Sequence, residues 1–231
     1  MKVNIWSDVR CPFCYIGKVK FEKALDQFPH KNEVEVIWKS FQLDPFLKAE
    51  TNSDVYDYFS KIKGISRDHA AQMFENVTQV AKEVGLNFNL ENSVHANSFN
   101  AHRLIQFAKA KNLGNEMEEE LFKIYFIEGK DIDDKEVLIE AASTIGLPVT
   151  ETRDVLNSDA YADDVKKDEL EAQEIGVRGV PFFVFNDKFA ISGAQSPEAF
   201  LQVLDQSWAD FEKEQPLTIL NGDSCTTEGI C

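Results

Sequence analysis

Two cysteines near the start of the chain, Cys11 and Cys14, are separated by only two residues. Two thiols at this spacing can close a small disulfide with little movement of the backbone, which suits them to thiol–disulfide exchange. A C-x-x-C pair can also be half of a zinc site, although such sites usually take four ligands from two cysteine or histidine pairs. The pattern therefore indicates redox chemistry first and metal binding second.

The residues around the cysteines predict a strand followed by a helix. Val3 and Ile5 alternate with polar residues as in a half-buried strand, which ends at the pair Ser7-Asp8. Beyond the cysteines, apolar side chains recur at i, i+3, i+4 and i+7 over residues 21–28, which is the spacing of an amphipathic helix. The two thiols are thus expected at a strand-to-helix turn.

This placement would also set the reactivity of the two thiols. If Cys11 is the N-cap, Pro12 takes the first helical position, where its missing N–H costs nothing. The Cys11 sulfur then faces free backbone N–H groups and the positive end of the helix dipole, which together stabilise a thiolate. We therefore predict that Cys11 is the nucleophile and that Cys14, one turn further along, is the resolving thiol.

The remaining elements follow in three blocks. Alternation from Val34 to about Phe41 predicts a second strand, parallel to the first because a helix connects the two. Apolar stripes then predict helices within residues 55–62, 73–84, 101–108, 117–125 and 133–145. Strand signals return at 182–185 and 189–191 as a hairpin, before a last helix that begins at Pro197.

These blocks predict an α/β fold in which a helical segment interrupts a single sheet, because the strands at the two ends of the chain need one another. We expect residues 1–48 and 151–213 to form the sheet domain and residues 49–150 to form a helical insertion. Residues 214–231 are polar, lack periodicity and read as a tail that carries Cys225 and Cys231.

A second motif, Gly179-Val180-Pro181, directly precedes the strand at 182–185. Proline fits at the first residue of a strand because it has no N–H to donate. If Pro181 lies opposite the cysteines, it discourages metal binding and leaves the Val180 backbone free to pair with an extended substrate. Sequence physics alone does not decide between this role, with a cis bond, and a simple strand-entry proline.

The motif Ser7-Asp8-x-x-Cys11-Pro12-x-Cys14-Tyr15-x-Gly17, the helical segment and Gly176-Val177-x-Gly179-Val180-Pro181-x-Phe183 together resemble the DsbA family. The resemblance spans residue 2 to about residue 210. Within the family, the sequence most resembles the FrnE-like branch, and residues 97–104 resemble a helical segment of that branch. The resemblance implies a thioredoxin-like fold with an inserted helical domain, a Cys11 nucleophile, a Cys14 resolver, a cis Pro181 and protein dithiols or disulfides as substrates. Phe13 stands where many FrnE-like sequences carry Trp.

The same fold occurs in relatives that resemble kappa-class glutathione transferases and hydroxychromene-carboxylate isomerases. Those proteins generally have serine at the position of Cys11, so the intact pair argues against that function. A non-catalytic zinc-binding module is the second alternative. The four histidines and the remaining two cysteines show no spacing of a zinc knuckle: His30, His69, His95, His102, Cys225 and Cys231.

Several further residues are candidates for tuning the site. Asp8 could accept the proton of Cys14, although a loop-capping carboxylate is the simpler interpretation. Arg10 could favour the Cys11 thiolate, and His102 could face the cleft, although a structural histidine is the simpler interpretation. In the tail, Cys225 and Cys231 form a candidate second redox pair that could exchange electrons with the first.

Composition narrows the partners. The net charge is −16, with 40 acidic and 24 basic side chains, which disfavours binding to nucleic acid or to anionic membrane surfaces. No apolar run approaches the roughly 18 residues that cross a bilayer, and the first residues lack the features of a secretory signal. We expect a cytoplasmic enzyme that needs no cofactor beyond its redox disulfide. Its expected substrates are protein thiols and disulfides, and glutathione or a thioredoxin-type reductant is a candidate partner.

Overall fold

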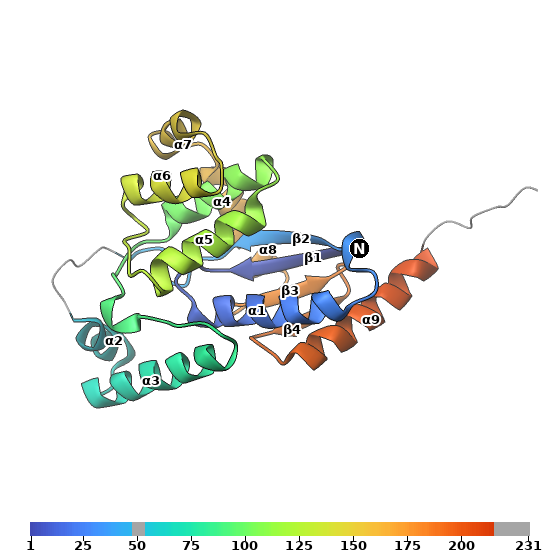
Figure 1. Ribbon diagram of the computed structural model, residues 1–231, viewed down its shortest axis with the longest axis horizontal. Helices are drawn as coiled ribbons and strands as arrows, with labels where there is room; N and C mark the ends of the chain where they lie inside the picture. Colours follow the sequence, from blue (N-terminus) through green and yellow to red (C-terminus); the bar gives the residue numbers. More distant parts are fainter. Residues whose placement is uncertain (48–53, 215–231) are drawn as a thin grey trace, which may run out of the picture.

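The computed structural model describes residues 1–47 and 54–214, which form a mixed four-stranded sheet surrounded by helices (Figure 1). The strands are β1 (Lys2–Ser7), β2 (Glu35–Ser40), β3 (Phe182–Phe185) and β4 (Phe189–Ser192). Their order in the sheet is β2-β1-β3-β4. β1 runs parallel to β2 and antiparallel to β3, and β3 pairs antiparallel with β4, so the two ends of the chain share one sheet.

The helices cover both faces and one edge of this sheet. In chain order they are α1 (Pro12–Gln27), α2 (Val55–Lys63), α3 (Arg67–Glu83), α4 (Phe99–Ala110), α5 (Gly114–Phe126), α6 (Lys135–Thr144), α7 (Val149–Leu156), α8 (Ala162–Glu174) and α9 (Pro197–Glu214), with short 3₁₀ turns at Lys31–Glu33 and Leu90–Asn92. Figure 1 shows α1 and α9 in front of the sheet, α8 behind it, and α4 to α7 gathered beside the β2 edge.

Alternation along β3 builds a core on each face of the sheet. Phe183 is fully buried, and its ring lies 5.6 Å from that of Phe21 on α1 and 4.7 Å from that of Phe200 on α9. Phe182 points the other way, toward the smaller cluster around Trp6 beneath α8. The phenylalanines of β3 therefore hold helices on the sheet, as expected for a strand that is covered on both faces.

The helical block is joined to the sheet through α5, which packs against both β2 and α1. The five predicted helices of the block are all present. Around the cysteines, β1, α1 and β2 have the predicted strand–helix–strand arrangement with parallel strands. The predicted boundary at residue 150 falls within α7, which packs on α4 and α6.

Two helices were not predicted. Residues 151–175 show no clean apolar period, yet α7 and α8 form there, and α8 lies against β2 and α4. Asp168 of α8 explains the docking because its carboxylate accepts the backbone N–H of Ser40 at 2.9 Å and the side-chain amide of Gln106 at 2.6 Å. Its charge is balanced by Lys39, with Nζ at 3.1 Å. Buried polar contacts of Asp168 thus hold this helix in place together with two small buried apolar side chains, Val165 and Ala172.

Candidate functional site

Cys11 and Cys14 lie at the junction of β1 and α1, both as free thiols. Cys11 is the N-cap of α1, with extended backbone angles of φ −93° and ψ 110°, and Pro12 occupies the first turn of the helix. The backbone N–H of Cys11 donates to the carbonyl of Asp8 at 2.9 Å, and the N–H of Cys14 donates to the carbonyl of Cys11 at 2.9 Å. The loop is thereby held in one geometry, and the Cys11 side chain makes no capping hydrogen bond to the first turn of the helix.

The two sulfurs differ in environment although both side chains are buried. Cys11 is 5% exposed and lies at the end of the helix, whereas Cys14 is 1% exposed and faces the interior. Burial and then the neighbouring Cys11 sulfur raise the pKa of the Cys14 thiol well above its ordinary value. Cys14 is thus held as a neutral thiol until something removes its proton.

The loop before β3 lies directly against the cysteines. The Val180–Pro181 peptide bond is cis, and the Sγ–H of Cys11 donates to the carbonyl of Val180 at 3.4 Å. Gly17 makes this approach possible, because a Cβ at that position of α1 would lie 3.0 Å from Cγ of Pro181. Residues 169 positions apart in the sequence therefore meet at one sulfur atom.

Apolar side chains are exposed between the two cysteines and in the loop after β2. Phe13, between the two cysteines, is 43% exposed, and Leu43 and Phe46 in the loop after β2 are 51% and 88% exposed. The Leu43 loop is tied to the site, because its N–H donates to the Asp8 carboxylate at 2.8 Å. Exposed aromatic and aliphatic groups are typical of surfaces that bind an apolar partner.

Asp8 and His102 form a buried pair behind the loop. Asp8 is fully buried, its oxygens accept the backbone N–H groups of Arg10 at 3.1 Å and Leu43 at 2.8 Å, and His102 Nε2 lies 3.5 Å away. Burial opposes ionisation of both groups, but the mutual contact outweighs it, so the pKa of Asp8 is lowered and that of His102 is raised. The carboxylate therefore fastens the active-site loop, in line with the capping interpretation.

Glu118 of α5 is a buried acid that the sequence did not single out. It is 1% exposed, and its Oε1 accepts the hydroxyl of Ser7 at 2.6 Å. The Ser7 side chain also lowers the pKa of the Cys14 thiol, against the larger raising effects of burial and of Cys11. Burial raises the pKa of Glu118 to about 7, against opposing contributions from Ser7, His102 and Lys18. In the sequence, Glu118 sits among four acidic residues within 116–120, and nothing there distinguishes a buried carboxyl from its exposed neighbours.

The other predicted residues fall into two groups. The charge of Arg10 lowers the pKa of both Tyr125 and Asp8, so Arg10 belongs to the same electrostatic cluster. Cys225 and Cys231 lie outside the described residues. Within residues 1–47 and 54–214, no three cysteine, histidine, aspartate or glutamate side chains gather in a way that could hold a metal ion.

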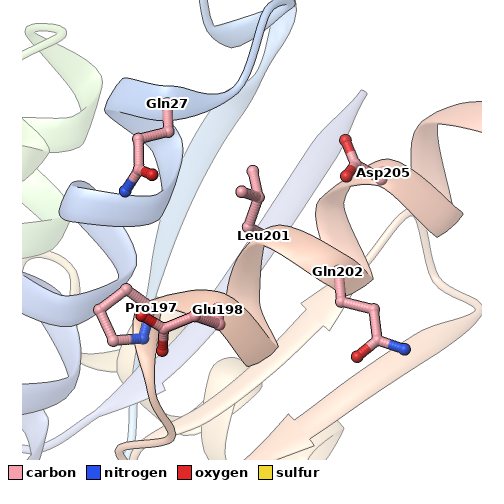
Figure 2. Close-up of a pocket in the computed structure, with 6 residues that line it drawn as sticks. All are labelled: Gln27, Pro197, Glu198, Leu201, Gln202 and Asp205. Carbon is pink, nitrogen blue, oxygen red and sulfur yellow. The ribbon is translucent and has the colours of Figure 1, made fainter.

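A cavity of about 290 Å³ lies far from the cysteines, between the last turn of α1 and the first half of α9 (Figure 2). It is lined by Gln27, Pro197, Glu198, Leu201, Gln202 and Asp205. Because α1 has 16 residues, its two ends are about 24 Å apart. The cavity therefore cannot serve the thiols.

Together, the mixed sheet, the C-x-x-C pair at the start of α1 and the proline loop facing it define a thioredoxin-like fold with a helical insertion. The model of the DSBA-like thioredoxin domain family matches residues 2–205, and this chain belongs to that family. The structure resembles a probable DsbA oxidoreductase, SCO1869, of Streptomyces coelicolor, with 37% identity and a TM-score of 0.86 over 99% of this chain and 97% of that one. Uncharacterized protein YwbO of Bacillus subtilis is 28% identical over 86% of this chain and 92% of its own length.

More distant structures share the fold. The cytosolic disulfide reductase DsbM of Pseudomonas aeruginosa is 17% identical, with a TM-score of 0.60 over 93% of this chain and 98% of its own. A 2-hydroxychromene-2-carboxylate isomerase is 14% identical, with a TM-score of 0.63 over 93% of this chain and 97% of its own. Across the part of the chain that is described, no helix combines the length and apolar character needed to span a bilayer.

Proposed function

We propose that this protein is a thiol–disulfide oxidoreductase of protein substrates in which Cys11 attacks and Cys14 resolves. The observation that carries the proposal is the position of Cys11 as the N-cap of α1 with its sulfur 3.4 Å from the Val180 carbonyl. A helix N-terminus favours a thiolate, and the facing loop brings a substrate strand within reach of that sulfur.

The reaction proceeds in two exchanges. The Cys11 thiolate attacks a substrate disulfide, forms a mixed disulfide and releases one substrate thiolate. Cys14 then loses its proton and attacks the Cys11 sulfur, which closes the Cys11–Cys14 disulfide and releases the second substrate thiolate. Two electrons pass from the dithiol to the substrate disulfide, and the same steps run backwards oxidise a substrate dithiol.

A polypeptide substrate is supported by the exposed side chain of Phe13, which lies between the two cysteines, and by exposed Leu43, whose loop is tied to Asp8. A free backbone edge at Val180 would pair with an extended segment, while these side chains would contact its apolar residues. Phe13 also separates the two cysteines, so its replacement of the tryptophan of FrnE-like sequences should affect substrate fit. Because DsbM is a cytosolic disulfide reductase, we propose that this enzyme also works in the cytoplasm. A thioredoxin-type reductant or glutathione would then restore its resting form.

A glutathione redox titration of the purified full chain tests the proposal. Thiols are trapped at each glutathione ratio, and each cysteine pair is read by mass spectrometry. We expect Cys11–Cys14 to interconvert reversibly between dithiol and disulfide. A midpoint near −270 mV would favour a reductase, and one near −120 mV an oxidase or isomerase, by comparison with thioredoxin and DsbA. A pair that never forms a disulfide would refute the proposal.

Single substitutions assign the two roles. Cys14→Ser should accumulate the mixed disulfide with a peptide substrate, whereas Cys11→Ser should form none with the same peptide. The matched control is the double substitution Cys225→Ser and Cys231→Ser. If the tail pair is inert, this variant reduces insulin at the wild-type rate, and if the tail is an electron shuttle the rate falls.

The glutathione-dependent transferase or isomerase is the alternative that the same preparation can test. It predicts saturable binding of glutathione and turnover of an electrophilic small molecule, both surviving in Cys14→Ser. Zinc bound stoichiometrically to the purified protein would instead favour the metal-binding module.

A further inference from the structure

We propose that a groove along α3 is a docking site for a second protein, which presents a basic segment that also carries apolar side chains. The groove has a volume of about 550 Å³ and lies between α3 and residues 88–91, and Tyr56 of α2 also lines it. In Figure 1, α3 lies below α1, at the outer edge of the helical insertion. None of the residues that line the groove is a cysteine, so docking here does not depend on the proposed redox function.

The groove is elongated because one face of α3 forms its wall over most of the helix. From Asp68 to Lys82, the residues of α3 that line it recur at i, i+3, i+4 and i+7, which is the spacing of a single helical face. The helix rises by about 21 Å between these two residues, since each position adds about 1.5 Å. An extended chain rises about 3.3 Å per residue, so this length accommodates about six residues of a polypeptide.

Aromatic side chains supply the apolar part of the groove. Phe88 and Leu90 line it and are only 8% and 7% exposed, so they lie at its base. The half-buried rings of Tyr56 and Phe74 meet edge to face, with their centroids 5.3 Å apart. The Phe88 ring stacks on that of Phe126 at 4.8 Å. Because packed rings need not be ordered on binding, this surface favours the docking of apolar side chains.

The base of the groove is connected to the helix that carries the thiols. The Phe88 ring also stacks on the ring of Tyr15, at 5.9 Å between centroids, and Tyr15 directly follows Cys14 on α1. α3 itself packs against α1. A partner that docks in the groove is therefore held against the side of the helix at whose start the two cysteines lie.

The exposed rim of the groove is acidic. Asp68 and Glu75 on α3 and Glu91 on the facing segment all line the groove and are exposed. Lys82 is the one cation among the lining residues, so three carboxylates against one ammonium leave two negative charges in excess. A segment that carries lysine or arginine complements this rim.

The nearest arginine does not neutralise the rim. Arg67 lies over the ring of Tyr56, but its guanidinium is already paired with Asp54 at 3.2 Å and with Asp57 at 3.1 Å. Burial and then the charges of Glu91 and Asp54 raise the pKa of Tyr56, against the opposing charge of Arg67. The negative potential of the carboxylates therefore extends onto the aromatic wall of the groove.

Charge also decides between possible occupants. A second copy of this chain carries a net charge of −16 and is repelled by an acidic rim. Residues 215–231 of the chain contain Asp223 and Glu228 but neither lysine nor arginine, so they are not complementary either. Nucleic acid is repelled for the same reason. A segment of another protein in which lysine or arginine alternates with leucine or aromatic residues satisfies both the rim and the base.

A labelled peptide without cysteine, in which lysine and leucine alternate over eight residues, is the probe for this site. Fluorescence anisotropy follows its binding to the reduced full chain at pH 7. We expect saturable binding that weakens with added salt, because charges are screened beyond about 10 Å at 0.1 M ionic strength. Two peptides of the same length are controls. Serine in place of leucine, or glutamate in place of lysine, should weaken binding by about tenfold or more.

Charge reversals locate the binding site. Glu75→Lys on α3 and Glu91→Lys on the facing segment should each weaken binding of the lysine–leucine peptide by about tenfold. Glu83→Lys makes the same change of net charge on α3 but outside the groove, so it should bind the peptide as the wild type does. All three side chains are exposed, and the variants are expected to fold. Should one not fold, slower hydrogen exchange of residues 67–91 in the wild type with bound peptide carries the test.

The outcomes separate the docking site from the proposed function. Binding that does not saturate, or equal weakening by Glu75→Lys and Glu83→Lys, would overturn the docking site. Equal binding of the lysine–serine peptide would overturn it too, because charge attraction alone would then explain the result. A dimer of the chain that the peptide dissociates would assign the groove to a second copy instead. If the peptide binds but Cys11–Cys14 forms no disulfide in the glutathione titration, the proposed function fails and the docking site stands.

Discussion

The buried carboxyl of Glu118 makes the stability of this protein depend on pH in a way that requires no assumption about its activity. Its pKa is about 7 in the folded protein because of burial, against an ordinary value of 4.5. Between these two values the folded state binds more protons at this site than the unfolded state does. Stability therefore falls as the pH rises through that window.

The size of the effect follows from the two pKa values. A difference of roughly 2.5 units corresponds to about 3 kcal/mol in total, of which about 2.5 kcal/mol falls between pH 5 and pH 8. The Glu118→Gln variant lacks this contribution, because an amide does not titrate. Its free energy of unfolding should therefore lose less with rising pH than that of the wild type, by about 2.5 kcal/mol over the same range.

Urea unfolding of both proteins at half-unit steps from pH 5 to pH 8 measures the difference. The pKa of His102 is raised by Asp8 against the opposing effect of burial, so its own stabilisation is also lost as the pH rises. That contribution is common to both proteins and largely cancels in the difference. A difference that stays constant from pH 5 to pH 8 would refute the assignment of Glu118 as a neutral buried acid.

Three further substitutions test the packing around the site. Phe183→Ala should lower the free energy of unfolding by about 3–5 kcal/mol because it removes a fully buried ring, and a loss below about 1 kcal/mol in urea unfolding would contradict the described core. Asp168→Ala should lower the free energy of unfolding by about 3–5 kcal/mol, because it leaves Lys39 and two N–H donors without their buried partner. Amide hydrogens of α8 that stay as protected from exchange as in the wild type would contradict this. Gly17→Ala should raise the free energy of unfolding by about 1 kcal/mol through helix propensity but lower it by about 1–3 kcal/mol through the clash with Pro181. We therefore expect a lower melting temperature, and a higher one would show that the Pro181 loop moves aside at little cost.

The sequence was sufficient for those parts of the fold whose signals are local. The alternation of β1, the proline after Cys11 and the turn at Asn186-Asp187 each act over a few residues, and each predicted element is present. α8 was missed because its contacts are made by Asp168, whose partners lie more than 60 positions away in the sequence. An isolated reading of residues 162–174 shows only a polar segment.

The same limit applies to the site. Spacing and position predict Cys11 and Cys14 as the reacting pair, and the interpretation of Asp8 as a loop-capping carboxylate agrees with its contacts. Glu118 could not be found, because its burial and its contact with Ser7 depend on how α5 docks, 111 residues further along the chain. A pattern of acidic residues on a helix usually marks a solvated face, and only the packing shows which one is turned inward.

The distance in sequence between the two halves of the site has a consequence for biosynthesis. Val180 emerges from the ribosome 169 residues after Cys11, which at translation rates of about 5–20 residues per second takes about 8–34 s. During that interval β1 can pair with β2, but β3 does not yet exist. The nascent chain thus displays its two thiols before the strand that shields them has been made, and the last quarter of the polypeptide completes the centre that the first few residues began.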